Sequence, residues 1–473
     1  MVTTATKARS NWTRLIVAGA VLLVSAPGIS ADIEGSVAIG ATATDNLFQD
    51  PDEGEEEVIL RLEPTVSLEH ESERVNADVD YRMQAYRYDG LEKNEIYHQY
   101  NAFLSGALVP DTFFLDLGAN RTQSIVDPDG QIPSGNLPIS VNRQDRDEYY
   151  FSPIFEYAFG RGVSVRAQYR HNWLDYSEDS AISSEDRDGF FSIANYRRGR
   201  GFTWALRYSQ LQTEYDESLF KWEYREAMAE LGFWAGSNLR LFASGGKESA
   251  WDTPLDPSLE DDVWEAGFAY KSKGKVSAEF ATGERSFGPS WRGSLTADLR
   301  RISTTISYAE RPTTTNRTPY QDPDFTDPVA PNDLVGRPGQ AASFISNRFD
   351  WRFQVEANRT KFLLGVYDET RTDRRSFSGQ PLLDEAQSGV NLSITYRLGS
   401  RTEVTARGSL ADWDLEPAGE RRLVRGWLSA KYDWGSRTSV TLEYQYGEQD
   451  SQDPAILTDY VINSVSLMLS REF

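Results

Sequence analysis

Apolar and polar residues alternate with a period of two in one segment of this chain after another. In the segment 163–170, one parity carries Val163, Val165, Ala167 and Tyr169, and the other carries Ser164, Arg166, Gln168 and Arg170. This alternation is typical of a β-strand with one apolar face and one polar face. We find no helical period of useful length, so the sequence predicts an all-β fold.

The number of alternating segments favours a membrane barrel over a soluble β-protein. Counting between turns gives about 22 strands, with an even number from about 18 to 24 as the range. Side chains cannot fill the interior of a closed barrel of that size. We therefore expect a single antiparallel transmembrane β-barrel, whose apolar parity faces lipid and whose polar parity lines a hydrated lumen. A slip of one residue would push Arg166 and Arg170 into lipid, at about 2–4 kcal/mol each near the midplane, so the register is strongly specified.

The connections between these strands are of two kinds. One kind is tight and basic, as at 160–162, 272–275 and 434–437. The other kind is longer and mostly acidic or proline-rich, and it comprises 50–57, 123–145, 175–186, 247–262, 312–346, 372–384, 412–421 and 448–457. Short periplasmic turns and long external loops are typical of an outer-membrane barrel. Because the N-terminus is delivered from the periplasm, the first acidic loop is expected outside.

Two places in this pattern are harder to interpret. The parity is blurred over 187–234. Pro64 and Pro153 lie inside predicted strands, and because proline cannot donate to a ladder, we expect bulges at both positions.

The N-terminal residues have the layout of a secretory signal. Three basic residues within 1–14 precede an apolar run, 15–26, which is followed by small residues up to Ala31. This run is too short to span a bilayer as a helix. We therefore expect a signal peptide at 1–31, cleaved after Ala31, and an outer-membrane barrel at 32–473, with no composition shift that indicates a second domain.

Charge and cysteine content exclude several classes of function. The formal charge is −23, and because 1–31 carries three basic residues and no acids, the mature chain would carry −26. Nucleic acid is therefore excluded as a partner. The absence of cysteine excludes disulfide scaffolds and thiolate metal sites, and nothing in the sequence indicates a cofactor.

The last segment of the chain, 461–473, is expected to close the barrel. Its apolar parity, Val461, Val465, Leu467 and Leu469, should face lipid, and Ser464, Ser466 and Ser470 should face the lumen. We expect it to pair with 33–41, because an unpaired apolar edge would template aggregation. The terminal Phe473 looks like the signal by which the barrel assembly machinery receives outer-membrane barrels.

Charged residues of the inward parity are the candidate functional residues. The predicted lumen-lining residues are Arg61, Glu63, Glu69, Arg82, Glu156, Arg166, Arg170, Arg207, Glu265 and Glu279. A wall of mixed sign suits a neutral or modestly charged polar solute better than an ion filter, whose ring carries one sign. The alternative is that these charges only keep the lumen wet. The loops 123–145 and 312–347 are the candidates for folding into the pore; alternatively, both lie on the surface.

Enzymatic and metal sites find little support in the sequence. The chain has three histidines, His70, His98 and His171, on different hairpins and with no nucleophile elbow nearby, so we predict that the protein is not an enzyme. The acidic runs 50–57 and 258–262 lack the fixed spacing of a calcium loop. They either bind divalent cations that bridge to lipopolysaccharide or form a solvated face.

Several short segments resemble a known family, the PEP-CTERM system-associated outer-membrane proteins. The segments that carry the likeness are 63–68, 80–81, 98–102, 283–289 (GERSFGP), 308–310 and 463–473, and they extend over nearly the whole chain. The family pattern in the first loop is shortened or altered here at 45–48. The resemblance implies a porin encoded near exosortase and exopolysaccharide genes, and it implies no catalytic residue.

These observations predict a porin-like channel that acts as a passive conduit. By resemblance, the channel is associated with exopolysaccharide export or the PEP-CTERM system. Its expected partners are outer-membrane lipid, lipopolysaccharide, the barrel assembly machinery and polysaccharide. The main alternative is a closed surface scaffold whose acidic loops engage polysaccharide; a remote alternative is a hydrolase at the outer rim.

Overall fold

The structure is a computed structural model of the chain. It describes residues 31–51, 54–124, 131–133, 135–140, 142–160, 162–177, 183–196, 201–216, 221–251, 259–272, 274–317, 320–321, 333–334, 342–376, 381–415, 419–451 and 459–473. The predicted signal peptide lies outside these ranges, apart from Ala31. Within the described ranges, no helix is long and apolar enough to cross a membrane.

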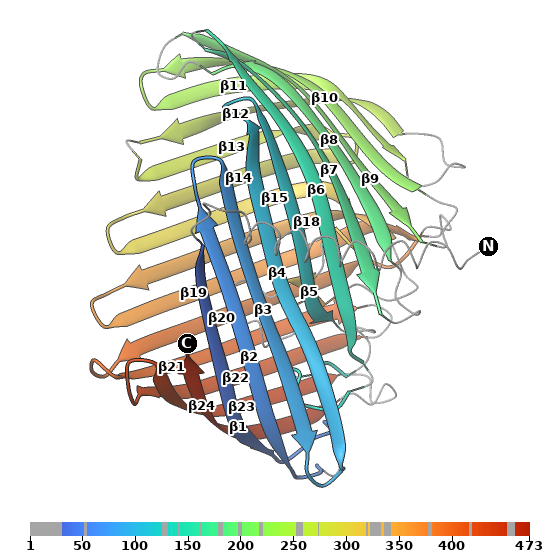
Figure 1. Ribbon diagram of the computed structural model, residues 1–473. Coiled ribbons are helices and arrows are strands. Elements are labelled where there is room, and N and C mark those ends of the chain that lie inside the picture. Colours follow the sequence, from blue (N-terminus) through green and yellow to red (C-terminus); the bar gives the residue numbers. More distant parts are fainter. Residues whose placement is uncertain are drawn as a thin grey trace, which may run out of the picture.

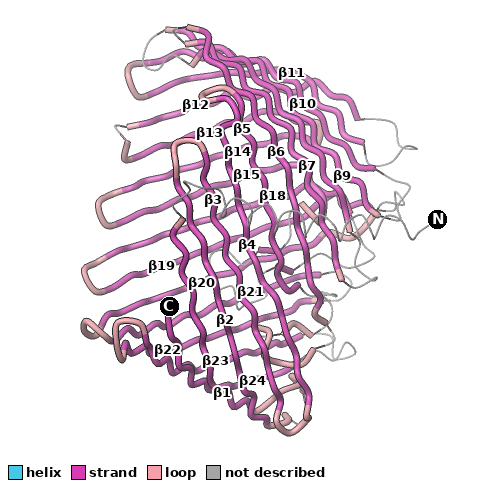
Figure 2. The backbone as a smooth tube through the Cα atoms, viewed as in Figure 1, coloured by secondary structure: helices cyan, strands magenta, loops and turns pink. Residues whose placement is uncertain are grey.

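Twenty-two long antiparallel strands form a closed barrel, as predicted (Figures 1 and 2). The first eleven are β1 (Asp32–Thr44), β2 (Glu57–Glu71), β3 (Val75–Tyr88), β4 (Lys93–Val109), β5 (Phe113–Ser124), β6 (Gln144–Phe159), β7 (Val163–Tyr176), β8 (Ser184–Asn195), β9 (Phe202–Tyr215), β10 (Lys221–Ala235) and β11 (Leu239–Trp251). The others are β12 (Leu259–Lys271), β13 (Val276–Arg285), β14 (Gly288–Asp298), β15 (Ile302–Thr314), β18 (Ala342–Glu356), β19 (Thr360–Ser376), β20 (Glu385–Arg397), β21 (Thr402–Leu415), β22 (Glu420–Asp433), β23 (Thr438–Ser451) and β24 (Tyr460–Glu472). Two-residue strands, β16 (Tyr320–Gln321) and β17 (Asp333–Leu334), lie between β15 and β18 in the chain.

The barrel closes between its first and last strands. β24 pairs with β1 from Ser36 opposite Glu472 to Thr44 opposite Ser464. The residues of β1 that pair with β24 are therefore 36–44, which is a shift of three residues from the expected range, 33–41. The chain ends at Phe473, whose backbone N–H donates to the carbonyl of Gly35, so the first residues of β1 extend past β24 and pair only with β2.

Alternation separates the two faces of the wall, as the sequence predicts. In β2, Leu60 and Leu62 are 48% and 42% exposed, whereas Arg61 between them is 9% exposed. In β24, Val461, Val465, Leu467 and Leu469 are exposed, and Ser464 and Ser466 are buried. Exposed apolar residues recur on nearly every long strand of the described chain, which is the surface that lipid would cover.

Aromatic residues mark one rim of this apolar band. Phe202, Trp434 and Phe473 lie at or beside the short turns and are 80%, 68% and 67% exposed. Aromatic side chains at this position are suited to the headgroup level of a membrane.

The two rims differ in the length of their connections. The short turns of one rim include 72–74, 299–301 and 434–437, and many of those between the later strands lie on the left of Figure 1. The opposite rim carries the longer connections, such as 45–56 and 125–143. Three of its connections, 89–92, 286–287 and 416–419, are also short, so the contrast between the rims is less uniform than expected.

The proline bulges predicted at Pro64 and Pro153 are absent. β2 and β3 pair up to Leu62 opposite Ala85 and resume at Thr65 opposite Arg82, which keeps the register unchanged. β6 and β7 pass Pro153 in the same way. Each proline loses ladder pairs on one side while it remains paired with the strand on the other side. The blurred segment, 187–234, forms most of β8, β9 and β10.

Candidate functional site

The structure places all the predicted lumen-lining residues on the inner face of the wall. Except for Glu69, which lies nearer the short turns, and Arg166, whose neighbours are only partly exposed, each of them is adjacent in sequence to a large, exposed apolar residue that points outward. Arg82, for example, follows Tyr81 and lies opposite Thr65 and Gln99 in the neighbouring strands. These positions agree with the alternation of the strands, and the contacts of the side chains show which residues the fold brings together.

Arg61 joins four strands across the seam where the barrel closes. Its guanidinium lies 2.6 Å from the carboxylate of Glu63 and donates to the hydroxyls of Thr42 and Ser466, both at 3.2 Å. The ring of Tyr86 lies 5.8 Å from its central carbon. This arrangement satisfies a buried charge with one opposite charge and two hydroxyls, as burial requires.

A second cluster links Glu265 and Glu279 through a residue that the sequence did not single out. Arg292 on β14 lies 3.1 Å from Glu265 and 2.5 Å from Glu279. Arg285 on β13 lies 3.7 Å from Glu265, 3.0 Å from Glu226 and in contact with Glu248. The wall from β10 to β14 thus carries a continuous ladder in which each arginine lies between carboxylates.

The same ladder explains one of the segments that resemble the PEP-CTERM-associated family. In the turn at 286–287, the backbone N–H and hydroxyl of Ser286 both donate to Glu248, at 3.1 and 3.0 Å. Gly288 follows this turn with a φ of 114°, a conformation that side chains other than glycine rarely adopt. The GERSFGP segment therefore shapes a tight turn and anchors it to the inner wall.

Arg207 belongs to a third cluster, at the inner wall of β9 to β11. It pairs with Glu230, which also lies 2.6 Å from Arg240, and it donates to the hydroxyl of Tyr196 at 2.8 Å. Arg240 lies over the rings of Tyr196 and Phe242.

The remaining predicted residues lie on β6 and β7. Arg166 pairs with Glu156 at 3.2 Å, and both side chains are nearly half exposed. Arg170 lies over the ring of Tyr150, 4.0 Å from its centroid. The same ring covers Gly118, where an added Cβ would lie 2.0 Å from the ring edge.

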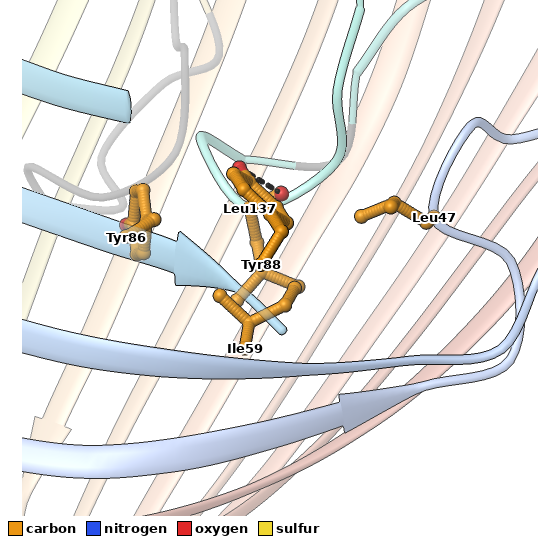
Figure 3. Close-up of a cluster of buried hydrophobic side chains, with 5 residues drawn as sticks. All are labelled: Leu47, Ile59, Tyr86, Tyr88 and Leu137. Carbon is orange, nitrogen blue, oxygen red and sulfur yellow. Dashed lines mark hydrogen bonds between the residues drawn. The ribbon is translucent and has the colours of Figure 1, made fainter. Parts of the chain in front are cut away.

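Part of the β5–β6 connection folds inside the barrel. We call its described residues, 131–133, 135–140 and 142–143, the inner loop. Leu137 packs in a buried cluster with Leu47, Ile59, Tyr86 and Tyr88 (Figure 3). The hydroxyl of Tyr88 donates to the carbonyl of Leu137 at 3.0 Å, and Ile139 donates to the carbonyl of Leu47 at 3.1 Å. Of the two possibilities for the loop 123–145, the structure therefore supports folding into the lumen.

The inner loop also reaches the strands beyond the seam. The backbone N–H of Ile132 donates to Gln449 on β23 at 3.0 Å, and the hydroxyl of Tyr460 on β24 donates to the carbonyl of Ile132 at 2.6 Å. Arg143 holds the loop together by donating to the carbonyls of Gly135, Asn136 and Pro138. The inner loop thus covers the inner wall from β23 to β5 near the rim of long connections.

A second segment, 315–317, leaves β15 and contacts strands that are not its neighbours; we call it the strap. Arg317 lies 2.7 Å from Asp188 and 3.4 Å from Asp186, both on β8, and donates to the hydroxyl of Thr213 on β9 at 2.8 Å. Asn316 donates to Ser184 at 2.9 Å. β9 to β14 lie between β8 and β15 in the wall, so the strap connects the end of β15 with strands that are distant from it in the sheet. Burial lowers the pKa of the Arg317 guanidinium, but the nearby carboxylates of Asp186 and Asp188 outweigh burial and raise the pKa above its usual value.

The candidate loop 312–347 contributes more than the strap. Its first and last residues belong to β15 and β18, and one residue of β17, Asp333, pairs in parallel with Ser124 at the end of β5. The other residues of this loop, apart from β16 and β17, lie outside the described residues between 318 and 341.

The sequence missed the partners of the predicted charges. Glu226, Glu230, Arg240, Glu248, Arg285 and Arg292 all lie on the inward parity of alternating segments, so the same parity rule applied to every strand would have found them. The pairing among them depends on the stagger between neighbouring strands, because the alternation fixes which face a residue occupies but not a shift by two residues. The three histidines lie on β2, β4 and β7, and the structure does not bring them together.

Comparison with known proteins supports the fold of this chain alone. No protein-family model matches the chain, and no curated protein matches it. Among solved structures, the FrpB iron transporter of Neisseria meningitidis (F5-1 variant) is similar with a TM-score of 0.51 at 9% identity, over 93% of this chain and 83% of that chain. A ferric enterobactin receptor (PfeA) mutant of Pseudomonas aeruginosa aligns with a TM-score of 0.49 at 8% identity, over 94% and 81% of the two chains. OmpT lacking loop L8, an outer membrane protein of Vibrio cholerae, aligns with a TM-score of 0.34 at 10% identity, over 94% and 99%. The chain therefore has the fold of an outer-membrane β-barrel.

Proposed function

We propose that this protein is a porin-like channel through which polar solutes diffuse passively. The observation that carries this proposal is the inner wall, on which charged side chains are paired and partly exposed from β6 to β14. Such a wall is hydrated, and it has no ring of charges of a single sign. It therefore suits the passage of neutral or modestly charged solutes better than strongly selective ion conduction.

The inner loop and the strap set the width of this channel in the proposal. Both segments lie on the inner side of the wall near the rim of long connections. A constriction made of loops, with a wide lumen beyond it, limits the size of the solute and leaves the rest of the wall accessible.

Planar-bilayer conductance tests the proposal. Purified protein should give stable open-channel steps, and deletion of 131–140 should enlarge them because the constriction is removed. A protein that inserts as a folded barrel, with a heat-dependent shift on a gel, but stays electrically silent before and after the deletion contradicts the channel.

A closed surface barrel is the second candidate, and the burial of the inner loop favours it. Next to the seam, the long connections form a pocket of about 440 Å³ that is lined by the carboxylates Asp45, Asp50, Glu56, Glu448, Asp450 and Asp459. In this candidate, the acidic rim engages polysaccharide or cation-bridged lipopolysaccharide, and the lumen conducts nothing. Binding of purified polysaccharide by an electrically silent barrel would favour it over the channel.

The biological setting that we propose is exopolysaccharide export or the PEP-CTERM system. It rests on the resemblance of the short strand and turn segments named above, such as 283–289. Loss of the protein should then lower the amount of secreted polysaccharide, and unchanged secretion would contradict this setting without affecting the proposed channel.

A further inference from the structure

The wall beneath the inner loop differs chemically from the rest of the lumen. Here the inward side chains include a group of buried amides and phenols beside the Arg61–Glu63 pair. We call this group the amide strip; it consists of Gln84, Tyr88, Gln99, Gln123, Gln449 and Tyr460. All six are more than nine-tenths buried. The wall from β9 to β14 instead presents arginine and glutamate.

The inner loop binds the amide strip through uncharged groups. The side-chain amide of Asn136 donates to Gln84 at 2.8 Å and to Gln123 at 3.0 Å. Backbone groups of Ile132 and Leu137 bond to Gln449, Tyr460 and Tyr88. These donors and acceptors resemble the hydroxyl groups of a polyol, since a hydroxyl can both donate and accept.

The loop satisfies this surface only in part. Among the described residues, Nε2 of Gln84, Oε1 of Gln99, Oδ1 of Asn136 and Nε2 of Gln449 have no hydrogen-bond partner. A buried polar atom without a partner costs about 1–3 kcal/mol. The amide strip thus offers both donors and acceptors that the loop leaves unused, which is unexpected if it serves only to hold the loop.

We propose that the amide strip is a binding site for an uncharged saccharide, which replaces the inner loop when the loop withdraws. Saccharide hydroxyls supply the missing donors and acceptors, and the rings of Tyr86 and Tyr97 beside the strip supply apolar contact. Charged saccharides are disfavoured, because the amides and phenols of the strip carry no charge and the neighbouring Arg61 guanidinium is already paired with Glu63. This inference rests on the proposed channel and names its solute class.

A reversible lock on the inner loop tests the proposal. The chain has no cysteine, and a backbone hydrogen bond of 3.1 Å places Leu47 next to Ile139, so a disulfide between these two positions is the lock that we choose. We expect maltohexaose to block ion current through the wild type. The oxidised Leu47→Cys/Ile139→Cys variant should lose this block, and reductant should restore it.

Substitutions in the amide strip provide the second arm. Gln84→Leu and Gln99→Leu should each raise the half-blocking concentration of maltohexaose at least tenfold, whereas the control Gln354→Leu, a lumen-facing glutamine on β18, should leave it unchanged. An oligogalacturonate of equal length should block weakly in every variant. If a substituted protein fails to assemble, the oxidised and reduced forms of the locked variant still decide.

Failure of the proposed saccharide site can be distinguished from failure of the proposed channel. Current in potassium chloride without sugar tests the channel alone. Given such current, the saccharide site is wrong if maltohexaose does not block the wild type. It is equally wrong if the block survives the oxidised lock and both substitutions, or if oligogalacturonate blocks as strongly.

Discussion

At the scale of residues, the inner wall contains charge pairs of two kinds. Arg61 and Glu63 are buried, with side-chain exposures of 7% and 12%, whereas Arg166 and Glu156 are 46% and 45% exposed. Removing one partner of a buried pair leaves an uncompensated charge, at about 3–5 kcal/mol, while an exposed pair contributes about 0–1 kcal/mol. Stability should therefore depend on the pair at the seam.

We predict that Arg61→Ala destabilises the barrel strongly and that Arg166→Ala changes its stability little. The double variant Arg61→Gln/Glu63→Gln should lose less than Arg61→Ala, because no buried charge remains unpaired. The measurement is the temperature at which the folded band disappears from a gel. Equal losses for Arg61→Ala and Arg166→Ala would contradict this assignment.

Gly118 gives a second test at this scale, because the ring of Tyr150 covers it. A Cβ added at Gly118 would lie 2.0 Å from that ring, whereas one added at Gly106 would find its nearest neighbour 4.0 Å away. Gly118→Ala should displace Tyr150 and the Arg170 guanidinium above it, and so lower the unfolding temperature. Gly106→Ala is the matched control and should be close to neutral. A Gly118→Ala barrel as stable as the control would show that the ring moves aside without cost.

At the scale of elements, the strands and the connections play different parts. The strands form a wall whose register is fixed by lipid on one side and water on the other. The inner loop and the strap are held by side-chain contacts, of which the ion pairs of Arg317 with Asp186 and Asp188 are the strongest. A connection held by a few side chains can be released by a single substitution.

We predict that Arg317→Gln loosens the strap and raises single-channel conductance. Asp186→Asn should also raise the single-channel conductance, but by less, because Asp188 still pairs with Arg317. Arg311→Gln, at an exposed position on β15, is the control. Unchanged conductance in Arg317→Gln channels would show that the strap does not limit the current.

At the scale of the whole molecule, the period of two was enough to predict the all-β class and the strand number, and it placed Arg61 and Glu265 on the polar parity of their strands. It did not predict the partners of these residues, because Arg292 meets Glu265 only through the stagger of β12, β13 and β14. The prediction of bulges at Pro64 and Pro153 was wrong because two strands can omit residue pairs around a proline and keep the same register. The sequence left open whether the inner loop folds into the pore or lies on the surface. Its burial depends on contacts with Tyr88 and Tyr460, which are far from the loop in sequence.

Closure is the property of the whole molecule that the C-terminal strand controls. β24 is bonded to β23 on one side and to β1 on the other, so the wall has no free edge there. Phe473 follows β24 at the rim of short turns, is 67% exposed, and donates its backbone N–H to Gly35. Its side chain is thus available for recognition, while its backbone contributes to the seam.

We predict that Phe473→Ser lowers the yield of assembled barrel in cells several-fold and leaves the conductance of each assembled channel unchanged. The backbone bond to Gly35 survives this substitution, so the loss should come from delivery to the assembly machinery. Trp434→Ser is the matched control, because Trp434 is an aromatic residue at the same rim with a similar exposure of 68%. If both variants assemble equally well, Phe473 is an interfacial aromatic like Trp434, and closure of the barrel does not depend on its recognition.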